Sequence, residues 1–117
     1  MKDIAYKLLW STIESDVGMH EILWEVNTLL PENTSDQNLE IAKNIIGYFL
    51  EHGLATLHFS VWRKQDREKI DSEKTSELLN KNTSWDPPSI GENYIMISNT
   101  EKGKHVYDQK FLPNYMV

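Results

Sequence analysis

Hydrophobic residues recur at helical spacing along the first part of the chain. Between residues 4 and 13 they fall three or four positions apart, which predicts a helix over 4–14 with Asp3 as its N-cap. A second stripe of the same kind covers residues 19–30, and Pro31 ends it because proline cannot continue a helix.

A third apolar stripe predicts a helix from about residue 35 to residue 52. Thr34 or Ser35 offers the N-cap, because a side-chain hydroxyl can accept a hydrogen bond from a first-turn N–H group. Gly53 is a natural residue to end the helix, since glycine tolerates the left-handed backbone found there. The first half of the chain is therefore predicted to be a three-helix unit.

The pattern then changes to the period of two that is typical of strands. Residues 54–62, "LATLHFSVW", alternate apolar and polar side chains and predict a half-buried strand, on which His58 faces solvent or touches the inserted helix. Residues 93–98 predict a second strand, with Tyr94 and Met96 on one face and the neighbouring isoleucines on the other. Asn99 or Thr100 offers a cap for a final helical turn.

Three distinct segments lie between these two strands. Residues 63–69, "RKQDREK", form a dense charge cluster, and residues 71–82 predict a short helix that points Leu78 and Leu79 inward. The prolines of "WDPPS", residues 85–89, predict a rigid turn.

Three helices followed by two strands that can pair is the element order of a winged helix-turn-helix. The phrases "EHGLATLHF" and "YIMISNTEKGKHVY" resemble that superfamily over most of the chain. The expected fold is therefore α+β and mainly α, with a winged-helix-like three-helix core and a two- or three-stranded antiparallel β-hairpin. We expect a single domain over residues 1–117, which departs from the superfamily by a helical insertion at about 63–92 between the wing strands.

The distribution of charge argues against DNA binding through the third helix. The chain carries a net charge of −6, and residues 1–52 hold nine acidic residues and three lysines. On the third helix and its lead-in, Lys43 is the one basic residue among four acidic ones. Phosphate contacts supply most of the affinity of nucleic-acid binders, so this balance would repel DNA.

The charge cluster at residues 63–69 leaves two interpretations open. Its four basic side chains belong to a wing that grips phosphates, or they form a solvated loop whose charge is balanced by interleaved acids. The basic residues are Arg63, Lys64, Arg67 and Lys69, and the acids are Asp66 and Glu68.

Candidate chemistry is sparse. The chain has no cysteine, and its four histidines are not spaced as metal ligands, so we expect no metal, no cofactor and no enzymatic activity. His20 is expected on the exposed side of its helix. The absence of a long apolar segment or a leader-like N-terminus, together with the absence of cysteine, leads us to expect a cytoplasmic protein.

The four tryptophans need separate interpretations. Trp10 and Trp24 lie near apolar stripes and are expected in the core. Trp62 ends the first strand and Trp85 opens the proline turn, and each is either an anchor of the insertion onto the core or an exposed binding residue of the kind that is enriched at protein interfaces.

In size, charge and its content of asparagine, lysine and isoleucine, the chain is similar to bacterial toxin-immunity proteins. That resemblance implies a cytoplasmic immunity protein of contact-dependent growth inhibition or a related system, whose partner is a basic toxin, such as a nuclease. Its carboxylates would take the place of nucleic-acid phosphates. The candidate partner-binding residues are Asp66, Glu68, Asp71, Glu73, Glu77, Trp85 and Asp86. The alternatives are a winged-helix transcriptional regulator and a structural accessory domain.

Overall fold

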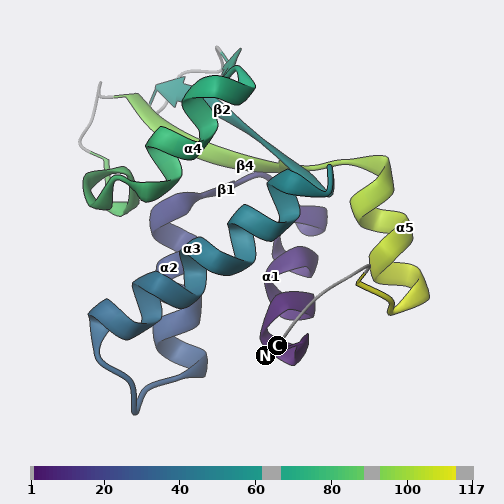
Figure 1. Cartoon of the computed structure of the whole chain (residues 1–117), viewed down its shortest axis with the longest axis horizontal. Helices are drawn as coiled ribbons and strands as arrows, with labels where there is room; N and C mark the ends of the chain where they lie inside the picture. The colour runs from purple at the N-terminus through teal and green to yellow at the C-terminus, as the bar shows by residue number, and fades with distance from the viewer. Residues whose placement is uncertain (1, 62–66, 89–92, 113–117) are drawn as a thin grey trace.

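Five α-helices, one 3-10 helix and a four-stranded antiparallel sheet make up the part of the chain that the computed structural model describes, residues 2–61, 67–88 and 93–112 (Figure 1). The elements in chain order are α1 (Lys2–Glu14), β1 (Val17–Gly18), α2 (Met19–Leu29), α3 (Ser35–Glu51), β2 (Ala55–Val61), β3 (Arg67–Lys69), α4 (Ser72–Asn80), η1 (Asn82–Trp85), β4 (Asn93–Asn99) and α5 (Glu101–Gln109). The fold is α+β and mainly α, as predicted.

Local capping signals place the ends of α3. The Thr34 hydroxyl accepts a hydrogen bond from the Gln37 backbone N–H, and the Gln37 side chain accepts one from the Thr34 N–H at 2.8 Å. This capping box satisfies first-turn donors that have no partner inside the helix. At the other end Gly53 has a φ of +70°, the left-handed backbone that its missing Cβ permits. By contrast, α1 begins at Lys2, so Asp3 lies in its first turn and is not its N-cap.

The sheet has the strand order β1–β4–β2–β3. β2 and β4 pair along their whole length, with Leu57 opposite Ile97. Side chains opposite each other in an antiparallel pair lie on the same face, so Leu57, Ile95 and Ile97 share one buried face while Tyr94 and Met96 lie on the other. This division of β4 confirms the prediction from its alternating pattern.

Two short strands extend this sheet to four strands, beyond the two or three that were predicted. β1 pairs with β4 through Val17 opposite Ile97, and β3 pairs with β2 through Arg67 opposite Ser60. The part of the charge cluster at 67–69 is therefore a strand and not a loop, while residues 62–66 lie outside the described residues. Strands of two or three residues are too short to show a period, and the neighbouring strand supplies their pairing.

The three-helix unit and the sheet form one hydrophobic core. Figure 1 shows α1, α2 and α3 gathered below the sheet, with α5 beyond the end of β4 and beside α1. The largest fully buried aliphatic and aromatic side chains are contributed by α1–α3, the residue before β2, β4 and η1: Leu8, Leu9, Met19, Ile22, Val26, Ile45, Ile46, Phe49, Leu54, Trp85 and Ile97. Three helices and antiparallel strands thus share one core, in agreement with the predicted α+β, mainly α fold class.

The segment predicted as an insertion packs onto this core. It contains β3, α4 and η1; α4 lies against α3, and η1 lies against α2. Leu79 of α4 and Trp85 of η1 are buried among the core residues, so these two side chains anchor the segment to the core. α4 ends at Asn80, within the predicted range of 71–82.

Several predicted exposures are wrong. Trp10 and Trp24 are 43% and 55% exposed, whereas the sequence places them in the core. His20 is buried although it was expected at the surface, and His58 is buried beside Ser98 and Asp16, not in solvent. Helical or strand spacing places a residue on a face, but it does not show which neighbouring element covers that face.

Candidate functional site

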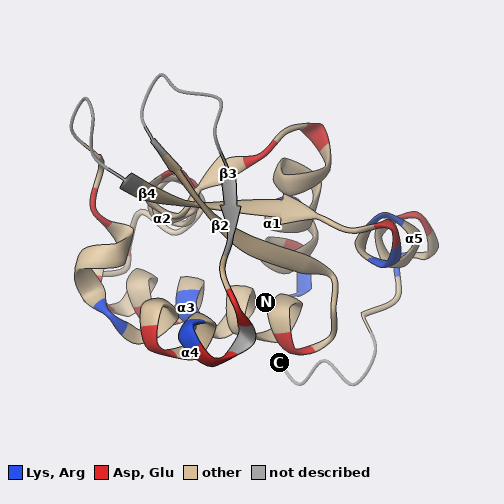
Figure 2. Cartoon of the chain, turned by 90° about the horizontal axis from the view of Figure 1, so that it is seen from above, with Lys and Arg blue, Asp and Glu red and all other residues tan. Residues whose placement is uncertain are grey.

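The described acidic residues of the predicted binding surface lie on α4 and just after η1. Glu73 and Glu77 are exposed on α4, and Asp86 is exposed at the end of η1. Figure 2 shows acidic positions along α4, at the edge of the molecule and beside α3. Residues 71–80 hold three carboxylates and one lysine, so this helix is a net acidic surface.

Asp71 combines this charge with a structural role. It is the N-cap of α4, and its Oδ1 accepts a hydrogen bond from the Lys74 backbone N–H at 3.1 Å. Such a cap stabilises a helix by about 1 kcal/mol. Replacing Asp71 therefore changes the stability of α4 as well as the surface charge.

Trp85 does not belong to an exposed surface, and its prediction as a binding residue is wrong. The side chain is 2% exposed, and its indole Nε1–H donates to the Leu79 carbonyl oxygen at 3.0 Å. Leu79 is itself in the core, so the tryptophan lies where the insertion meets the three-helix unit. The alternative interpretation, an anchor for the insertion, describes its position.

Two further predicted residues are placed only in part or not at all. Asp66 lies outside the described residues. Glu68 belongs to β3, where its backbone is opposite Phe59 of β2, and its side chain is not among those described. The site below is therefore built from the other residues.

A groove of about 1020 Å³ runs between α3, the start of β2 and α4. Buried apolar side chains form its floor, among them Leu57, Ile70 and Leu79. Exposed carboxylates lie along its edges: Glu40 and Glu51 on α3 and Asp71 before α4. We call this hollow the α3–α4 groove.

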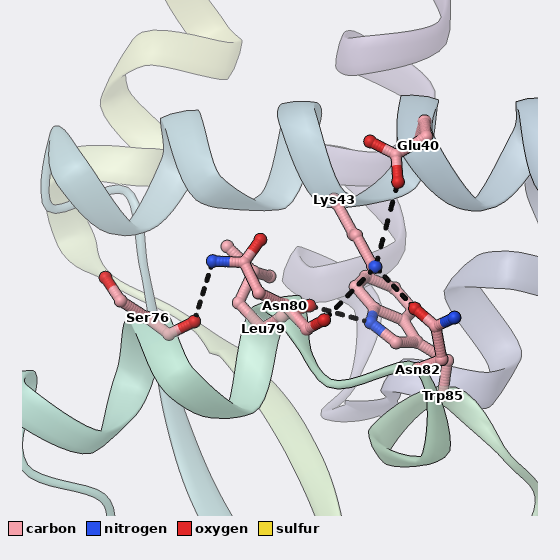
Figure 3. A network of polar contacts seen from close by, with 7 residues as sticks. All are labelled: Glu40, Lys43, Ser76, Leu79, Asn80, Asn82 and Trp85. Atoms are coloured by element: carbon pink, nitrogen blue, oxygen red, sulfur yellow. Dashed lines mark hydrogen bonds and ion pairs between the residues drawn. The ribbon is translucent and has the colours of Figure 1, made fainter.

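Lys43 is the one lysine or arginine among the described residues that line the groove, and its ammonium group is already engaged (Figure 3). Nζ donates to Asn82 Oδ1 at 2.6 Å and to the Asn80 carbonyl oxygen at 3.3 Å. It lies 3.8 Å from the Glu40 carboxylate, and the lysine side chain is only 10% exposed. The cation of α3 thus serves to hold the insertion.

Gly47 explains how α4 approaches α3 so closely. A Cβ at this position would lie 3.1 Å from Leu79 Cδ2, which is a tighter contact than side chains normally make. Glycine in the middle of a long helix is costly, and close approach of a neighbour is one reason to keep it. Together with Glu40, Asn44 and Glu51 it follows one face of α3 at helical spacing.

The groove residues on α3 were missed by the sequence analysis as part of a site with the insertion. Glu40 and Glu51 entered the prediction only as two of the four acidic residues on the third helix and its lead-in. A polar stripe that contains a glycine inside an otherwise amphipathic helix was the available signal for a packed neighbour. No local signal identified α4 as that neighbour.

A buried polar cluster lies elsewhere, where β2 and β4 meet the turn after α1. Ser98 Oγ donates to Asp16 Oδ1 at 2.8 Å and lies 3.2 Å from His58 Nδ1. His58 Nε2 also lies 4.0 Å from Asp16 Oδ2, so the three side chains contact one another and join three segments of the chain. The Ser98 hydroxyl donates to the carboxylate, whereas in a hydrolytic triad the serine hydroxyl donates to the histidine.

The described part of the chain offers little else of known chemistry. Among its residues, no group of three or more histidine, aspartate or glutamate side chains is arranged to hold a metal ion. No helix there combines the length and apolar character needed to cross a membrane. Comparison with known proteins gives no match for this chain, whether to a family model, to a curated protein or to a solved structure.

Proposed function

We propose that the chain is an immunity or interaction protein that binds and neutralises a basic protein, in particular a toxin domain such as a nuclease, in the bacterial cytoplasm. Acidic side chains of α3 and α4 make the contact and take the place of nucleic-acid phosphates. Contact-dependent growth inhibition is the kind of system in which such a protein works.

The observation that best supports this proposal is the packing of α4 on α3. In a winged helix that binds DNA, the third helix enters the major groove. Here α4 packs on α3 across Gly47, and the lone lysine of α3 is bound to the insertion. The charges left at the surface of the two helices are mainly carboxylates, which attract a basic protein and repel DNA.

The test uses the protein encoded by the neighbouring gene, co-expressed with this chain. We expect co-expression to restore growth, and the purified pair to bind with an affinity that falls as salt rises. Glu73→Lys with Glu77→Lys weakens binding, whereas Glu32→Lys, an exposed change in the lead-in to α3, is the matched control. Asp71→Asn removes the charge and retains a capping side chain. A neighbour that is harmless alone, or rescue that survives all these changes, contradicts the proposal.

The order of helices and strands favours one alternative, a winged-helix transcriptional regulator. That function requires salt-sensitive binding to duplex DNA. A gel shift with the DNA upstream of the gene at low salt separates the two functions. Retardation that disappears as salt rises supports the regulator, and no retardation at low salt excludes it.

A further inference from the structure

We propose that the α3–α4 groove binds a short segment of the protein partner that carries an apolar side chain flanked by lysine or arginine. This inference rests on the proposed function, because it specifies which part of the acidic surface makes the contact and what enters it.

The shape of the groove fits a side chain or a short peptide. Its volume of about 1020 Å³ lies at the upper end of the range of ordinary ligand pockets, roughly 300–1,000 Å³. Its residues come from α3, β2, the segment before α4, and α4 itself, so four parts of the chain hold it in shape. Helices and strands place binding groups more accurately than loops do.

The floor of the groove selects an apolar group. Leu57, Ile70 and Leu79 belong to the core and are each at most 9% exposed, yet they line this hollow. An apolar side chain that enters displaces water from this surface, which is the usual source of affinity in such a pocket. The hydroxyl-bearing Thr75 and Ser76 on α4 provide polar groups beside this floor.

The edges of the groove select positive charge. Glu40 and Glu51 are exposed on α3, and Asp71 lies at the start of α4 with one carboxylate oxygen accepting the Lys74 N–H. Lys43 lies 3.8 Å from the Glu40 carboxylate and offsets part of its charge, but the groove lining still holds three carboxylates to one lysine. A segment with lysine or arginine on either side of its apolar residue meets these carboxylates.

The same charges exclude other occupants. The phosphates of a nucleic acid would meet carboxylates along both edges. A second copy of this chain carries the same net charge of −6 and would be repelled. The occupant is therefore a segment of a different and basic protein.

The first experiment selects peptides without assuming a partner. A phage-displayed library of random 12-residue peptides is panned against the whole chain, and the enriched peptides are synthesised and measured by isothermal titration calorimetry. We expect enrichment of peptides with an apolar residue between lysines or arginines. Enrichment of acidic or uncharged peptides, or no enrichment, overturns the proposal.

Variants then locate the site. Ser76→Trp fills the groove from α4 and is expected to weaken peptide binding at least tenfold; Glu40→Lys with Glu51→Lys is expected to do the same by reversing the edges. Gln109→Trp on α5 and Glu32→Lys are the matched controls and should leave affinity unchanged. Circular dichroism and thermal unfolding verify folding, and Asn44→Trp fills the groove from α3 if Ser76→Trp does not fold. Binding that survives both kinds of groove variant overturns the proposal.

The same variants distinguish this inference from the proposed function. If the toxin is neutralised equally well by wild type, Ser76→Trp and Asn44→Trp, the groove proposal fails while the immunity function stands. If basic apolar peptides bind the groove but no toxin is neutralised, the immunity function fails while the groove proposal stands.

Discussion

The Lys43 ammonium group lies 2.6 Å from Asn82 Oδ1, although 39 residues separate the two along the chain. The contact connects α3 with η1, which belongs to the insertion. The same Nζ also donates to the carbonyl oxygen of Asn80 at the end of α4. The lysine side chain is only 10% exposed, whereas its two asparagine partners lie at the surface. The one lysine of α3 therefore links this helix to α4 and η1.

The hydrogen bond between Lys43 and Asn82 predicts that substitutions at these two positions are energetically coupled. Lys43→Met keeps the aliphatic stem and removes the charge, and Asn82→Ala removes the acceptor. In a double-mutant cycle measured by urea unfolding, we expect a coupling energy of about 1 kcal/mol, the usual net contribution of an intramolecular hydrogen bond, because this bond lies at the surface. Lys104→Met, an exposed change on α5, is the control and should not couple to Asn82→Ala. A coupling near zero would show that the contact contributes no stability.

Substitution of Trp85 should destabilise the protein much more than substitution of Trp24. Trp85→Phe leaves a cavity in the core and removes the donor to the Leu79 carbonyl oxygen, so we expect a loss of about 2 kcal/mol in the free energy of unfolding. Trp24→Phe, at a side chain that is 55% exposed, should cost less than about 0.5 kcal/mol. Urea unfolding followed by far-UV circular dichroism measures both, and equal losses would contradict the burial described above.

His20 predicts a dependence of stability on pH. Burial lowers the pKa of His20 below its ordinary value of 6.5, and the neighbouring Glu21 carboxylate partly opposes that shift. The unfolded chain therefore binds the proton more tightly, so this stabilisation is fully present above about pH 6.5 and is lost as the pH falls through the lower folded pKa.

The measurement compares His20→Gln with wild type by urea unfolding between about pH 5 and pH 7. The variant should show a shallower fall in the free energy of unfolding, whereas His105→Gln, at an exposed position on α5, should keep the wild-type slope. The titration midpoint of the His20 ring protons, followed by NMR, should lie below 6.5. Parallel pH profiles for His20→Gln and wild type would refute the assignment.

Replacing Gly103 of α5 by alanine should destabilise the protein, although the position lies inside a helix. A Cβ there would collide with the Leu54 carbonyl oxygen and lie 2.6 Å from the Asn99 side-chain nitrogen, so α5 would have to move away from the strand ends. Alanine is favoured over glycine in helices by about 1 kcal/mol, yet we expect Gly103→Ala to lower the free energy of unfolding by about 1–3 kcal/mol. Lys104→Ala on the same helix is the control. A stabilised Gly103→Ala variant would show that α5 is not packed as described.

The sequence was sufficient to predict which charges of α4 lie at the surface. It did not predict which other residues complete the candidate site. The exposed charges of Glu73 and Glu77 follow from a short helix with leucines on its other side, and a single helix determines this arrangement. The assignment of Trp85 to the surface failed, and Glu51 was not joined to the insertion. Both depend on how α4 packs against α3, which involves residues far apart in the chain.

Local signals were sufficient to predict α2 with its end before Pro31, α3 between the Thr34 cap and Gly53, and the long strands β2 and β4 with their alternation. Which surfaces those elements cover follows from the packing of the folded chain. The burial of His20 and His58, the exposure of Trp24, and the groove between α3 and α4 all arise from contacts between distant segments. Capping and periodicity act over a few residues, whereas burial depends on which neighbouring element covers a side chain.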